Sequence, residues 1–124
     1  MGTRVLSLWG PVIGWMGVIF FASSRSDTGA IGRIPDWLTH GATYFVLGLL
    51  LFRALAGGFD RRLSPGAGLL ALGLGAAYGA SDEWHQSFVP GRDASVWDVA
   101  KDVAGCCVAL AVHGLGMLPA RSHR

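Results

Sequence analysis

The stretch SDEWHQSFVPGR, residues 81–92, decides how the rest of the chain is arranged. It holds two carboxylates, an imidazole, an amide and a guanidinium between two strongly apolar segments, residues 67–80 and 103–112. Its end, Val89-Pro90-Gly91-Arg92, is typical of a turn, because proline presets one dihedral angle and glycine allows a positive one. The stretch therefore predicts that two apolar helices reverse direction here and bring their polar ends together.

The composition indicates a membrane protein. Of 124 residues, 52% are hydrophobic and only 15% are charged, whereas charged residues make up about a quarter of a soluble domain. The net charge is +2 and the basic residues are dispersed, so the chain lacks the basic patch that nucleic-acid binding needs. We expect residues 1–124 to form a single transmembrane domain without a nucleic-acid partner.

Four apolar segments predict helices near residues 5 to 23, 37 to 56, 66 to 87 and 95 to 117. The third segment is short, so its helix must continue into the charged stretch and carry these charges to membrane depth. Gly75 and Gly79 predict that this helix packs closely against another one. Gly10, Gly14 and Gly17 form a similar face on the first helix, and such faces also allow a homo-oligomer. The expected fold is an all-α membrane protein, an antiparallel bundle of four transmembrane helices.

The basic residues predict the orientation of this bundle. Lysine and arginine are more frequent on the cytoplasmic side of membrane proteins. Both termini are therefore expected in the cytoplasm of a multi-pass protein of the cell membrane, and the polar connections 23–40 and 82–102 are expected outside. The residues on the expected cytoplasmic side are Arg4, Arg53, Arg61, Arg62, Arg121 and Arg124, and those on the expected outer side are Arg25, Arg33 and Arg92.

Polar residues recur at helical spacing near the outer ends of three helices. Residues three or four apart lie on one helix face, and ionisable groups at membrane depth are costly unless they are paired or face a wet cavity. We expect Arg92 to pair with a neighbouring carboxylate, that of Asp82, Glu83 or Asp93. The residues expected to line one shared polar pocket are Asp36, His40, Asp82, His85, Arg92 and Asp98.

The segments DEWHQSFVPGR, residues 82–92, and DVAKDVAG, residues 98–105, resemble the motifs of VanZ-like membrane proteins. Ser23-Ser24 after the first apolar segment, and Asp36 and His40 at the start of the second, extend the resemblance over nearly the whole chain. The family takes its name from an accessory protein of teicoplanin resistance, so the resemblance implies a small integral membrane protein acting at the cell surface. The expected binding cluster comprises Ser24, Asp36, His40, Tyr44, Asp82, Glu83, His85, Gln86, Arg92, Asp98 and Asp102.

Three interpretations of the cluster remain open. In the first, it binds the headgroup of a membrane lipid, such as a lipid-linked cell-wall precursor, or a glycopeptide, and lowers teicoplanin susceptibility; Arg92 and Lys101 then supply positive charge. The second is a metal-dependent enzyme acting on a lipid phosphate or a lipid-linked substrate, with a divalent metal held by His40, Asp82 and His85. In the third, the cluster is a buried ion-pair network that only locks the helices together. The sequence assigns no catalytic residue.

Overall fold

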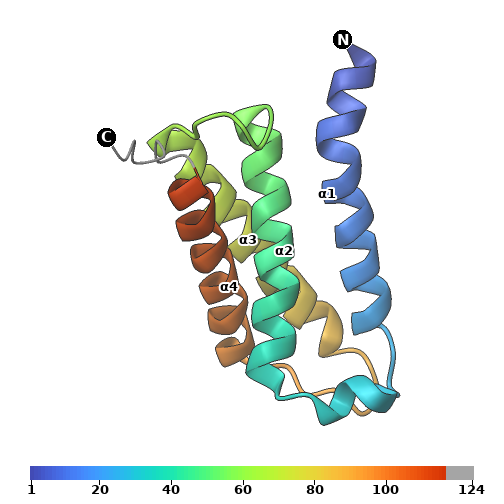
Figure 1. Ribbon diagram of the computed structural model, residues 1–124. Helices are drawn as coiled ribbons and strands as arrows, with labels where there is room; N and C mark the ends of the chain where they lie inside the picture. The colour runs from blue at the N-terminus through green and yellow to red at the C-terminus, as the bar shows by residue number, and fades with distance from the viewer. Residues whose placement is uncertain (117–124) are drawn as a thin grey trace.

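The computed structural model describes residues 1–116, which form four α-helices and one short 3₁₀ helix. In chain order these are α1 (Gly2–Ser23), η1 (Gly29–Arg33), α2 (Asp36–Ala56), α3 (Pro65–Gln86) and α4 (Val96–Gly116). Successive α-helices run in opposite directions, so the α1–α2 and α3–α4 connections share one end of the bundle (Figure 1). The N-terminus and the α2–α3 connection lie at the other end. The predicted all-α, antiparallel four-helix bundle is confirmed.

Three of these helices, α1, α2 and α4, are long and apolar enough to cross a membrane. Their most apolar windows have mean hydropathies of 1.8, 1.4 and 1.4, and about 20 such residues span the hydrocarbon core of a bilayer. The chain is therefore a membrane protein, as predicted. With 22 residues, α3 is as long as α1 but ends in the polar residues 81–86. A fourth crossing stays a prediction.

Local signals in the sequence set the helix ends. The Ser64 hydroxyl accepts a hydrogen bond from the backbone N–H of Ala67 at 3.2 Å, and Pro65 occupies the first helical position of α3. At the end of α2, Gly57 adopts the left-handed conformation with φ of 86°. Gly91 has φ of 78° in the turn between α3 and α4, as the Pro-Gly pair predicts.

Glycines allow α4 to approach both of its neighbours closely. A Cβ atom on Gly79 would lie 2.9 Å from Oδ2 of Asp102, and one on Gly75 would lie 2.7 Å from Sγ of Cys106. The close packing predicted for the glycine pair of α3 is confirmed, with α4 as its partner. Between α2 and α4, Gly105 lies directly against the backbone of residues 41 and 45.

The glycines of α1 make no such contact within the described residues. Gly10, Gly14 and Gly17 have no atom of another element within 4 Å of the position of a Cβ. Their predicted role in close helix packing therefore has no partner inside the described chain. Instead, the Trp15 indole donates to the Thr43 carbonyl oxygen at 2.9 Å, and the Tyr78 hydroxyl donates to the Met16 carbonyl oxygen at 2.5 Å.

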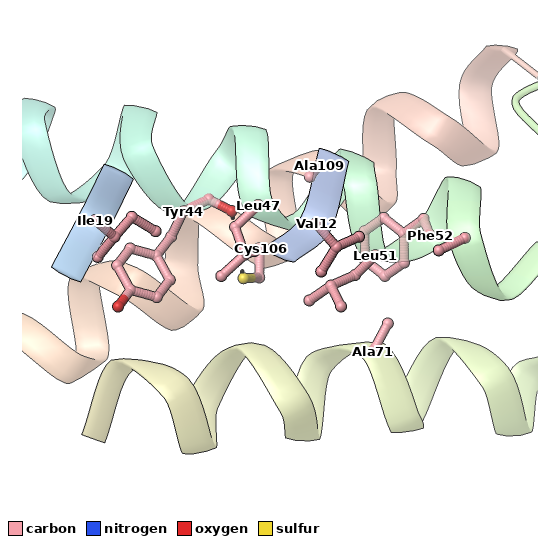
Figure 2. Packing of buried hydrophobic residues seen from close by; sticks show 10 residues of the cluster. Val12, Ile19, Tyr44, Leu47, Leu51, Phe52, Ala71, Cys106 and Ala109 are labelled. Atoms are coloured by element: carbon pink, nitrogen blue, oxygen red, sulfur yellow. Dashed lines mark hydrogen bonds between the residues drawn. The ribbon is translucent and has the colours of Figure 1, made fainter. Parts of the chain in front are cut away.

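The hydrophobic core lies among the four helices in the middle of the bundle (Figure 2). Tyr44, Leu47 and Phe52 of α2 are at most 1% exposed, as are Cys106 of α4 and Val12 of α1. The Cys106 thiol donates a weak hydrogen bond to the Tyr44 carbonyl oxygen at 3.4 Å. This packing fixes the rotation of the helices, and thereby decides which polar residues meet at the end where the two polar connections lie.

Candidate functional site

The polar residues at the end of the bundle with the α1–α2 and α3–α4 connections divide into two groups. Figure 1 shows α3 crossing behind α2, so that its C-terminal end approaches the C-terminal end of α1. The first group, called here the histidine–carboxylate cluster, joins α2, α3 and α4. The second, called here the Gln86 group, joins the ends of α1 and α3 to Arg92. The cluster consists of Asp36, His40, Glu83, Asp98, Lys101 and Asp102, and the Gln86 group of Ser23, Asp82, Gln86 and Arg92.

His40 occupies the centre of the histidine–carboxylate cluster. Its Nδ1 lies 2.7 Å from Oδ1 of Asp102, which is completely buried. On the other side of the ring, Nε2 lies 3.5 Å from an oxygen of Asp36 and 3.9 Å from an oxygen of Asp98. The polar faces predicted for α2 and α4 from the four-residue spacing therefore meet at this imidazole.

Lys101 forms ion pairs with the two outer carboxylates of the cluster, those of Asp36 and Asp98. Its ammonium group donates to Asp36 and, at 2.9 Å, to Oδ1 of Asp98. We predicted that Lys101 supplies positive charge to a ligand, and this prediction missed its two carboxylate partners. Residue spacing alone does not show how α2 and α4 lie relative to one another. Asp36 is the first residue of α2, and Pro35 precedes it as the capping residue.

Glu83 connects the end of α3 to the start of α4. The side chain is 5% exposed, and its Oε2 accepts a hydrogen bond from the backbone N–H of Ser95 at 2.9 Å. Among the buried side-chain atoms of the described residues that have no hydrogen-bond partner are Oε1 of Glu83 and Oδ2 of Asp102, both in the cluster, and the Tyr44 hydroxyl. Buried polar atoms are nearly always paired. The cluster can therefore accept further interactions.

The Gln86 group ties the end of α1 to the end of α3. The Gln86 amide donates to the Ser23 hydroxyl and to Oδ2 of Asp82, both at 3.2 Å, and its oxygen accepts from Arg92 at 3.1 Å. Arg92 also donates to the carbonyl oxygen of Arg25 at 3.0 Å. The predicted pairing of Arg92 with a neighbouring carboxylate is wrong for the part of the chain that the structure describes. The guanidinium binds oxygens of uncharged groups instead.

His85 lies apart from His40, against α1. Its ring stacks on Phe20 with 4.4 Å between ring centroids, and its Nε2 is 3.5 Å from the Ser24 hydroxyl. Asp82 contacts Gln86, and the candidate metal ligands His40, Asp82 and His85 do not form one of the possible metal-binding groups of the described residues. The sets that do bring histidine and carboxylates within 4.8 Å are Asp36, His40 and Asp98, and His40, Glu83 and Asp102.

A cavity of about 880 Å³ opens between α1, the α1–α2 connection, α2 and the end of α3. It contains Asp36, His40, Asp82 and Arg92 of the predicted shared pocket, whereas His85 and Asp98 are not among its lining residues. Tyr44 and Gln86 of the predicted binding cluster also line it. The lining residues that were not predicted include Trp15, Ser23 and Arg25. Of these, Ser23 was adjacent to the predicted Ser24, but spacing does not tell which of two consecutive serines points inward.

The sequence also matches a known protein family. The family model described as VanZ/LLP1 matches residues 8–115. The chain belongs to the VanZ/LLP1 family. No curated protein and no solved structure matches the chain. All residues of the histidine–carboxylate cluster, the Gln86 group and the cavity lie within the part that matches the VanZ/LLP1 model.

Proposed function

We propose that this VanZ/LLP1 protein binds the polar headgroup of an anionic membrane lipid in the cavity between α1 and α2. The observation that carries the proposal is the cavity itself, which combines an apolar wall with a polar, partly basic end. Its volume of about 880 Å³ lies within the usual range of small-molecule sites, roughly 300–1,000 Å³.

The apolar wall suits the part of a lipid next to its headgroup. Trp15, Val18 and Ile19 of α1 line the cavity, and Leu38 and Ala42 of α2 face it from the other side. Both helices have the length and apolarity of membrane spans. A lipid chain lying along them would meet apolar side chains while its headgroup reached the polar end.

The polar end suits a headgroup that carries both phosphate and hydroxyl groups. Arg25 and Arg92 line the cavity there, and arginine is well suited to bind phosphate oxygens. The carboxylate of Asp82 and the amide of Gln86 can hydrogen-bond sugar or glycerol hydroxyls. This chemistry matches a lipid-linked cell-wall precursor, whose shielding would lower susceptibility to glycopeptides such as teicoplanin.

A binding experiment with purified protein in nanodiscs tests this proposal. We expect a short-chain polyprenyl pyrophosphate to bind, and neutral phosphatidylcholine to bind far more weakly, as measured by native mass spectrometry. The variant Arg25→Gln should weaken pyrophosphate binding about tenfold or more, because a charged hydrogen bond contributes about 1.5–3 kcal/mol. Arg33→Gln is the matched control, since Arg33 is exposed and lies outside the cavity lining.

The apolar wall is tested with a second pair of variants on α1. Val18→Trp places a large side chain in the cavity, whereas Ile13→Trp adds the same bulk at an exposed position outside the lining. Loss of lipid binding and of teicoplanin protection with Val18→Trp alone would support the proposal. Equal binding by both tryptophan variants and the wild type would overturn it.

A second function is favoured by one observation, the contact between His40 and Asp102. His40 lines the cavity, and the buried carboxylate 2.7 Å from its Nδ1 holds the ring in one orientation. An imidazole held this way can take up or release a proton next to a bound headgroup. Hydrolysis of the pyrophosphate by wild-type protein, lost in His40→Asn, would favour an enzyme over a binding protein.

A further inference from the structure

Behind the cavity wall, three side chains from three helices form a compact buried set. His40 of α2, Glu83 of α3 and Asp102 of α4 each offer one ligand atom, and these atoms all lie within 4.8 Å of one another. Glu83 is 5% exposed and Asp102 is 0% exposed. Of the three, only His40 lines the cavity.

This buried set has unused hydrogen-bonding capacity. Oε1 of Glu83 and Oδ2 of Asp102 are buried without a hydrogen-bond partner among the described residues. Leaving a charged acceptor unpaired inside a protein is energetically costly. Two carboxylate oxygens, one on α3 and one on α4, therefore lack a donor or a cation.

The charges of the neighbouring groups also favour a further cation at this place. Lys101 forms ion pairs with Asp36 and Asp98, the two outer carboxylates of the histidine–carboxylate cluster. For Glu83 and Asp102 the structure records a backbone N–H and the His40 imidazole as partners. The inner part of the cluster thus carries two carboxylates and, without a further cation, at most one positive charge.

We propose that His40, Glu83 and Asp102 bind one divalent transition-metal ion. Nitrogen and carboxylate ligands together suit Zn²⁺ or Mn²⁺, and two ligands about 2.0–2.2 Å from one ion are at most about 4.4 Å apart. The three atoms need only a small adjustment to reach that geometry. The outer set with Asp36 and Asp98 is a poorer site, because the Lys101 ammonium already binds both carboxylates.

Metal binding is tested with the full-length protein in metal-free detergent and without lipid, so failure of the lipid proposal leaves the result intact. Titration with ZnCl₂ or MnCl₂ should give about one bound ion per chain by elemental analysis. Calorimetry in buffers of different ionisation enthalpy should detect proton release, because the ion replaces the proton held between His40 and Asp102. The thermal unfolding temperature should rise with metal concentration.

Matched variants assign the ligands. Glu83→Gln keeps an acceptor for the Ser95 N–H and should weaken binding at least tenfold, whereas Asp93→Asn, at an exposed position, should not. His40→Asn should also lose the ion, and His85→Asn should keep it. Circular dichroism before titration checks that each variant is folded. Binding below one ion in ten chains for the wild type, or unchanged affinity in folded Glu83→Gln, would overturn the proposal.

Discussion

At the scale of single residues, the two histidines near the polar end differ in what holds them. His40 has carboxylate oxygens near both ring nitrogens, and its partner Asp102 is completely buried. His85 stacks on Phe20, and its buried Nδ1 has no hydrogen-bond partner in the described chain. His40 therefore belongs to a polar network, whereas His85 is held mainly by ring packing.

We expect the same substitution to affect stability differently at the two positions. His40→Phe leaves the buried carboxylate of Asp102 without its imidazole partner, so it should destabilise the protein by about 1–3 kcal/mol. His85→Phe keeps a ring against Phe20 and removes an unpaired buried nitrogen, so the free energy of unfolding should change little or increase. Thermal unfolding of both variants in the same detergent measures the difference. Equal destabilisation by the two substitutions would contradict these assignments.

Residue spacing predicted which polar groups share a helix face, but not which neighbours they meet. Consecutive residues on a helix point about 100° apart, so Asp82 and Glu83 face different surroundings. Glu83 reaches Ser95 at the start of α4, and Asp82 contacts Gln86 and lines the cavity. That choice depends on the rotation of α3, which its packing against α4 fixes and which residue spacing does not specify.

At the scale of helices, Gly105 lies at one of the closest contacts between α2 and α4. A Cβ on Gly105 would overlap the carbonyl oxygen of Gly41 and lie 3.0 Å from the backbone nitrogen of Phe45. Backbone atoms cannot move aside as the end of a side chain can. Any larger residue at this position must push the two helices apart.

We therefore expect Gly105→Ala to lower the free energy of unfolding by about 1–3 kcal/mol, the usual cost of overpacking. The same change at Gly114 on the same helix is the control, since no atom of another element lies within 4 Å of its Cβ position in the described chain. Unfolding by denaturant in detergent micelles compares the two variants. If Gly105→Ala unfolds at the same denaturant concentration as Gly114→Ala, α2 and α4 do not pack as closely as described.

The helices themselves were well predicted. The ends of α2 and α3 lie within one residue of the predicted bounds, because Pro35, Gly57 and the Ser64-Pro65 pair are strong start and stop signals. The start of α1 lies three residues earlier than predicted, at Gly2, since the prediction relied on the apolar run and left out residues 2–4. The predicted end of α4 at residue 117 lies just outside the described residues.

At the scale of the whole molecule, the fold separates two ends of unequal charge. Arg4, Arg53, Arg61 and Arg62 belong to the end with the N-terminus, and the polar connections at the opposite end carry Arg25, Arg33 and Arg92. With Lys101 left out because it lies within α4, the first end has the excess of basic residues, which favours its placement in the cytoplasm. The cavity would then open toward the outer face, where glycopeptides act.

Labelling of single cysteines on intact cells tests this orientation. In a Cys107→Ala background, Ser26→Cys lies in the α1–α2 connection and Asp60→Cys in the α2–α3 connection, and both positions are exposed. Position 29 is less suitable, because Gly29 has φ of 53° and a cysteine there would be strained. An impermeant maleimide should label Ser26→Cys before lysis and Asp60→Cys only after it. The reverse pattern would turn the cavity toward the cytoplasm, where the protein could not shield a lipid from a glycopeptide outside the cell.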